Sequence, residues 1–183
     1  MPFYLKDRDI SLDIAMLHSV LIVPCRFCPA ASLAVRERKP YLELLRNFLR
    51  TPAYESYIQA MNSRLESEGI RTGVFDSKFP HQFAVCMWTS GRRNDLARQA
   101  VGYNAVIVLG CDAAVETARY CIKSNECLVI PGMEVEGIMN VIPILQFPFN
   151  IRLEVKSVTQ VLQHHAGPFP GGSSGSVSLA HFN

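Results

Sequence analysis

Short runs of β-branched and aliphatic residues alternate with segments of helical periodicity along most of the chain. Residues 18–24, 83–87, 105–110 and 127–130 form continuous apolar runs that predict buried strands. Two more strands are predicted at residues 141–147 and 151–155. Between these runs lie segments whose apolar residues recur every three or four positions, as in helices packed on one face.

The helical segments have recognisable start and stop residues. Pro29 and Pro40 each stand where a helix is expected to begin, because proline is favoured in a first turn. Thr51 is a candidate N-cap for a helix that begins at Pro52 and stops at Gly69. Two further helices are predicted at residues 94–101 and 112–123.

This alternation predicts an α/β fold with three layers, a mostly parallel sheet with helices on both faces, and a helical insertion after the first strand. We expect a lead-in segment over residues 1–17 and a single α/β domain over residues 18–163. The stretch 164–183 is rich in Gly and Ser and is expected to be a flexible tail.

The composition indicates an ordinary globular protein. Of the 183 residues 49% are hydrophobic and 19% are charged, and the net charge is +2, so we expect neither a nucleic-acid partner nor membrane insertion. The acidic residues near Lys6 and Arg8 make the N-terminus unlike a signal peptide, which favours a cytoplasmic location. In that compartment the six cysteines indicate metal binding or redox chemistry rather than structural disulfides.

Three of the cysteines fall at the ends of predicted strands, and a fourth lies one helical turn from the first. Cys25 follows the first strand, Cys28 lies one turn later, Cys86 ends the second strand and Cys111 follows the third. Because the carboxyl ends of parallel strands share one edge of a sheet, these thiols are expected to converge there. Four thiolates suit zinc or an iron–sulfur cluster. Cys121 and Cys127 are interpreted as small buried hydrophobic residues.

Two stretches resemble a known family. CRFCPAASLA and VCMWTSGRRNDLARQAVGYNAVIVLGC resemble the cysteine motifs of the iron–sulfur delta subunit of methyl-viologen-reducing hydrogenase and heterodisulfide reductase complexes. The resemblance implies a [2Fe–2S] cluster used in electron transfer, docked to a larger redox enzyme. The cysteines at the matching positions are Cys25, Cys28, Cys86 and Cys111.

Two other functions stay open. A strand that runs into C-x-x-C at the start of a helix is also typical of a thioredoxin-like thiol–disulfide oxidoreductase, with Cys25 as nucleophile and Cys28 as resolving thiol. Pro143 is then the candidate cis-proline. The remaining hypothesis is a non-catalytic interaction subunit whose cysteines are incidental.

One further motif has binding potential. The turn at Ser90, Gly91 and Arg92 stands before a predicted helix, where backbone N–H groups and arginine side chains could bind an anion. It is not a phosphate-binding P-loop, because the second glycine and the Gly-Lys-Ser/Thr sequence are missing.

Overall fold

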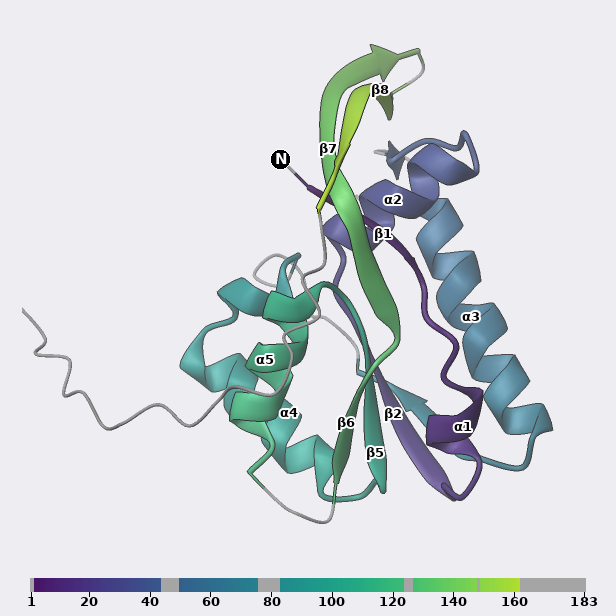
Figure 1. Cartoon of the computed structure of the whole chain (residues 1–183), viewed down its shortest axis with the longest axis vertical. Coiled ribbons are helices and arrows are strands. Elements are labelled where there is room, and N and C mark those ends of the chain that lie inside the picture. Colours follow the sequence, from purple (N-terminus) through teal and green to yellow (C-terminus); the bar gives the residue numbers. More distant parts are fainter. Residues whose placement is uncertain (1, 44–49, 76–82, 124–126, 148, 162–183) are drawn as a thin grey trace, which may run out of the picture.

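A computed structural model describes residues 2–43, 50–75, 83–123, 127–147 and 149–161. It has two four-stranded sheets, one parallel and one antiparallel (Figure 1). The α/β class is therefore confirmed, but the sheet content is not mostly parallel. The expected helix after Pro40 is replaced by a short strand, β3 (Leu42–Glu43), and residues 44–49 lie outside the described ranges.

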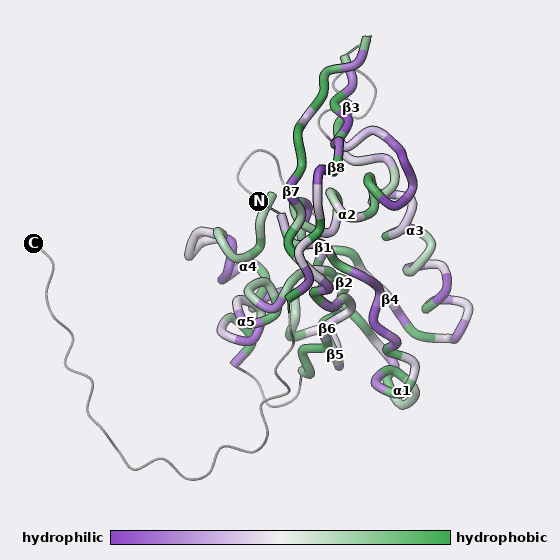
Figure 2. The backbone as a smooth tube through the Cα atoms, turned by 45° about the horizontal axis from the view of Figure 1, so that its top comes forward, coloured by the Kyte–Doolittle hydropathy of each residue, from purple (hydrophilic) through white to green (hydrophobic). Residues whose placement is uncertain are grey.

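The parallel sheet has the order β4-β2-β5-β6. Its strands are β2 (Ser19–Pro24), β4 (Arg71–Val74), β5 (Ala105–Leu109) and β6 (Leu128–Pro131). Every residue of β2 and β5 is buried, as their continuous apolar sequences predict, and β5 is hydrophobic in Figure 2. The sequence interpretation missed β4, a half-exposed edge strand that contains Gly73.

Helices cover both faces of this parallel sheet. On one face Val20, Ile22 and Ile107 pack with residues of α2 (Cys28–Arg36) and α3 (Pro52–Ser67). On the other face Leu21 and Val106 pack with residues of α4 (Ser90–Ala100) and α5 (Asp112–Cys121). Neighbouring residues of a strand therefore belong to opposite layers of the core.

The antiparallel sheet has the order β1-β7-β8-β3. Its long strands are β7 (Met133–Gln146) and β8 (Asn150–Gln160), which extend both predicted C-terminal strands and project away from the helices as a hairpin (Figure 1). Gly132 joins β6 directly to β7. A Cβ atom at Gly132 would lie 2.8 Å from Leu109 Cδ2 and 2.9 Å from Ile107 Cγ2, so this connection requires glycine.

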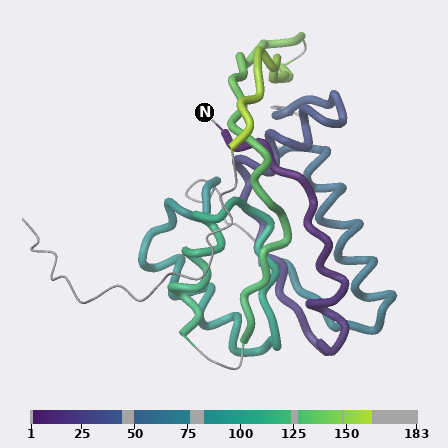
Figure 3. The backbone as a smooth tube through the Cα atoms, in the orientation of Figure 1, coloured from purple at the N-terminus to yellow at the C-terminus, as the bar shows by residue number. Residues whose placement is uncertain are grey.

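The segment expected as a lead-in is part of the fold. Residues 1–17 contain β1 (Phe3–Asp7) and α1 (Ser11–Ile14), and β1 runs antiparallel beside β7 (Figure 3). Leu5 is fully buried, and its amide donates a hydrogen bond to Ser32 Oγ of α2 at 2.9 Å. The sequence interpretation missed this strand, of whose five residues only Leu5 is fully buried. The predicted tail at 164–183 lies outside the described residues.

The predicted strand at 83–87 is wrong. Val85–Met87 forms a 3-10 turn, η1, and is not part of either sheet. Val85 is buried, whereas Phe83 is 38% exposed and Met87 is 81% exposed. A central strand needs two buried faces, and this segment has too few buried residues to supply them.

Candidate functional site

The cysteines gather where the connections of the parallel sheet change direction. The chain leaves β2 toward α2 and α3 on one face, and it leaves the neighbouring strand β5 toward α5 on the other face. Such a switch point leaves a crevice at the carboxyl ends of the two strands, where ligands bind in open α/β sheets. Cys25 follows β2 directly and Cys111 follows β5 after Gly110.

Cys28 and Cys111 begin the two helices that follow β2 and β5. Cys28 is the first residue of α2 and Cys111 is the N-cap of α5. Hydrogen bonding between the protonated Cys28 thiol and the Cys111 thiolate shifts their pKa values in opposite directions. This bond and the N–H groups of Ala113 and Ala114 lower the pKa of Cys111 to about 6, although desolvation opposes the shift. The same bond, together with burial, raises the pKa of Cys28.

Cys25 lies beside this pair but has a different protonation state. Its thiol donates to the carbonyl of Phe83 at 3.7 Å, and burial raises its pKa to about 11. The hypothesis of a C-x-x-C oxidoreductase assigns the nucleophile to Cys25. In this structure the thiol with a lowered pKa is Cys111, because hydrogen bonding with Cys28 and then the N–H groups at the start of α5 stabilise that thiolate.

Cys86 is the exposed member of the cluster. It lies in η1 rather than at the end of a sheet strand, and a thiolate at this position raises the pKa of Cys25. Three chain segments, residues 25–28, η1 and the start of α5, therefore contain these four thiols. Three of the thiols are buried, and all four cysteines are free.

The site as it stands does not have the geometry of a metal centre. Within the described ranges, no three side chains of His, Cys, Asp or Glu are arranged to hold a metal ion. The donor chemistry suits zinc or an iron–sulfur cluster, whereas the arrangement of the sulfurs does not. Cys121 is half-buried and Cys127 is buried, both outside this cluster.

Tyrosines and an ion pair surround the thiols. Tyr54 is fully buried, and its hydroxyl donates to the carbonyl of Leu109 at 3.2 Å. Burial, and to a lesser extent the charges of Cys28 and Cys25, raise the pKa of Tyr41 to about 12. Arg26, between the two cysteines of the C-x-x-C motif, is paired with Glu55 of α3, so its charge is already balanced.

The expected anion site is only partly formed by the residues proposed for it. Ser90 begins α4 and Gly91 follows in its first turn. The Arg92 side chain is only 10% exposed, with its guanidinium 3.9 Å from the Phe75 ring centroid and 3.7 Å from Asp95 Oδ2. Arg92 is thus held inside the fold, and Arg93 is the arginine near the surface at this turn.

The candidate cis-proline of the oxidoreductase hypothesis lies away from the helical layers. Pro143 is exposed in β7, opposite Leu153 of β8, in the projecting hairpin (Figure 1). No described helix is both long enough and apolar enough to cross a membrane.

Comparisons with protein-family models, curated proteins and solved structures find no match to this chain.

Proposed function

We propose that the protein binds a thiophilic metal centre, a [2Fe–2S] cluster or a zinc ion, through Cys25, Cys28, Cys86 and Cys111. With a cluster it acts as an electron-transfer subunit of a larger redox complex, and with zinc as an accessory subunit. The observation that carries the proposal is that Cys25 and Cys111 follow the two neighbouring strands at the switch point of the parallel sheet, with Cys28 in the first turn of α2.

Burial favours metal binding over exchange with a disulfide substrate. Cys25 is 2% exposed, Cys111 is 5% exposed and Cys28 is 8% exposed, so a protein disulfide has little access to them. Reactive thiols are normally partly exposed, whereas ligand thiolates are commonly buried and accept backbone N–H bonds. The backbone N–H groups of Ala114 and Ala113, at the start of α5, likewise help to lower the pKa of Cys111.

The arrangement of the sulfurs must adjust for this function. Cys28 and Cys111 share a proton in their hydrogen bond, and a metal ligand must be deprotonated. Metal binding therefore requires loss of the Cys28 proton and replacement of this hydrogen bond by bonds to the metal. The resemblance of the motifs to the hydrogenase delta subunit family also supports a [2Fe–2S] cluster at these four positions.

The opposite pKa shifts of Cys28 and Cys111 favour a second function, a dithiol–disulfide couple made by these two residues. The Cys111 thiolate would attack a small-molecule disulfide, the partner that can enter a buried site, and release one partner thiolate. The Cys28 sulfur would then attack Cys111 and release the second, so that the partner gains the two electrons lost by the pair. A disulfide needs the sulfurs about 2.05 Å apart, so both side chains would have to approach each other.

Metal and acid-labile sulfide analysis of anaerobically purified protein tests the first proposal. Equal iron and sulfide with visible absorbance, or zinc in a 1:1 ratio without colour, is the expected result. The Cys25→Ser and Cys111→Ser variants should lose the metal, and the control Cys121→Ser, which changes a cysteine outside the cluster, should keep it. Protein without metal contradicts the proposal.

The dithiol function has a separate readout. In metal-free protein, mild oxidation should remove two free thiols per chain, and a Cys28→Ser or Cys111→Ser variant should show no such loss. Retention of all thiols after oxidation contradicts the couple. Absence of both metal and disulfide would leave the non-catalytic interaction subunit.

A further inference from the structure

Two neighbouring cavities lie where the helices α4 and α5 pack together. A polar cavity of about 300 Å³ lies between the first turn of α4 and the end of α5. An apolar cavity of about 240 Å³ lies between the second half of α4 and the residues after α5. Both are lined by Cys121 and Lys123, so they form one groove with two ends, which we call the α4–α5 groove.

Two cations face the polar end of this groove. Arg93 comes from α4 and Lys123 follows α5, and both lie beside the ring of Tyr120, at 6.0 and 5.8 Å from its centroid. The described residues that line this cavity include no Asp or Glu. Two cations on neighbouring elements, with no carboxylate among the described lining residues, give this end of the groove a positive potential that attracts an anion.

Further donors at this end fit a phosphate. Arg93 donates to the carbonyl of Cys86 at 3.5 Å, and a guanidinium has five N–H donors, so this bond leaves most of them for a ligand. The Ser90 hydroxyl and the Asn94 amide also line the cavity. An arginine fork, an ammonium group and neutral donors match the several oxygens of a phosphate better than the two of a carboxylate.

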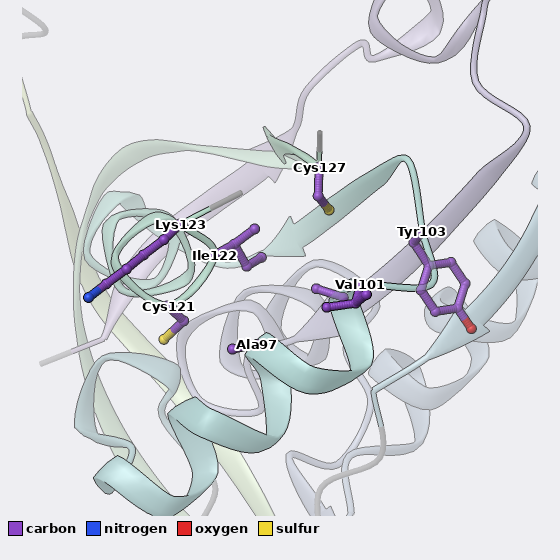
Figure 4. A pocket seen from close by; sticks show the side chains of 8 residues that line it. Ala97, Val101, Tyr103, Cys121, Ile122, Lys123 and Cys127 are labelled. Atoms are coloured by element: carbon purple, nitrogen blue, oxygen red, sulfur yellow. The ribbon is translucent and has the colours of Figure 1, made fainter. Parts of the chain in front are cut away.

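The other end of the groove is apolar. Ala97, Ala100 and Val101 of the α4 region line it together with Ile122 and Cys127. Val101 is 84% exposed, which leaves an apolar side chain in contact with solvent at the rim. Figure 4 shows the Lys123 ammonium on the side of Cys121 away from Val101 and Tyr103, so charge lies at one end and apolar surface at the other.

We propose that the α4–α5 groove binds a small organic phosphate. The phosphate lies between Arg93 and Lys123, and an aromatic or aliphatic body lies against Ala97 and Val101. This site is separate from the proposed metal centre and stands whether or not the protein binds a metal. It also changes the expected anion site, because Arg93 rather than Arg92 supplies the arginine.

Isothermal titration calorimetry of the full chain with 1-naphthyl phosphate, inorganic phosphate and 1-naphthol tests this proposal. We expect 1-naphthyl phosphate to bind about tenfold tighter than either of the others, since only it occupies both ends. Arg93→Gln and Lys123→Gln should each weaken its binding about tenfold. Arg98→Gln is the control, because Arg98 also lies on α4 but is paired with Asp95 and does not line the groove. This variant should change the affinity for 1-naphthyl phosphate less than about twofold.

The apolar end has its own variant. Ala97→Leu fills the groove at the second half of α4, and it should weaken 1-naphthyl phosphate while leaving inorganic phosphate unchanged. Circular dichroism and thermal melting confirm that each variant is folded. The proposal is overturned if 1-naphthyl phosphate does not bind, or if Lys123→Gln and Arg98→Gln have equal effects.

Discussion

Gly110→Ala is expected to separate α5 from β5 at the cysteine cluster. A Cβ atom at Gly110 would lie 2.6 Å from Ala114 Cβ and 3.3 Å from Cys25 Cβ. Carbon atoms in contact are normally about 3.5–4.0 Å apart, so the first contact forces backbone or helix movement. The movement would act on Cys111, because this residue connects Gly110 to the first turn of α5.

The expected loss of stability follows from two opposing effects. Overpacking in a close-packed interior costs about 1–3 kcal/mol, and the reduced freedom of the unfolded chain returns about 0.4–1 kcal/mol. The midpoints of these two ranges give a net fall of about 1.3 kcal/mol in the free energy of unfolding, measured by urea titration of reduced, metal-free protein. Gly91→Ala is the matched control. Its Cβ would meet no atom within 4 Å, and it should be neutral or stabilise α4 by up to about 1 kcal/mol.

A second substitution distinguishes this contact from a general effect of alanine. In an Ala114→Gly background the 2.6 Å contact no longer exists, so adding Gly110→Ala should cost at least about 0.5 kcal/mol less than in the wild type. An equal cost in both backgrounds, or a single variant as stable as the wild type, would refute the reasoning.

Three further predictions concern buried groups near the cluster. Ser32→Ala should lower the unfolding free energy by about 1–3 kcal/mol, because it leaves the buried Leu5 amide without its acceptor, and a neutral result in urea titration would contradict this. Tyr54→Phe should lower the unfolding free energy by about 1 kcal/mol in the same assay, because the Leu109 carbonyl loses the Tyr54 hydroxyl as a donor but keeps the Cys25 amide. A loss above about 3 kcal/mol would contradict this prediction. Stability of reduced, metal-free protein should rise with pH between about 6 and 9.0, where the unfolded chain but not the native protein holds the Cys111 proton. The unfolding free energy should then fall between pH 9.0 and about pH 11, where the native protein retains the Cys25 proton and the unfolded chain has lost it. A series of urea midpoints without a maximum near pH 9 would contradict the predicted rise and fall.

The central strands could be predicted from sequence because burial on both faces leaves a clear signal. β2 and β5 are continuous apolar runs, and their observed bounds differ from the predicted ones by one residue each. The segment at 83–87 gave a similar signal over fewer buried positions and forms a 3-10 turn instead. β1 was missed for the opposite reason, since only Leu5 among its five residues is fully buried.

The cysteine site could be predicted only up to strand order. That Cys25 and Cys111 follow strands is visible in the sequence, but the pairing of β2 with β5 joins segments more than 80 residues apart. The hydrogen bonding of Cys28 with Cys111 depends on how α2 and α5 begin on opposite faces of the sheet. The spacing of C-x-x-C predicts that Cys25 and Cys28 act together. It contains no information about Cys111, which comes from the start of a distant helix.

The α4–α5 groove and the cysteine cluster are joined by one side chain. Arg93 lines the groove and donates to the carbonyl of Cys86, whose thiolate raises the pKa of Cys25. An anion that draws Arg93 into the groove would weaken its bond to Cys86 and so act on the only exposed thiol among the four. If an anion draws Arg93 into the groove, the effect of groove occupancy on the cysteines equals the effect of the cysteines on anion binding, because coupling free energies between two sites are reciprocal.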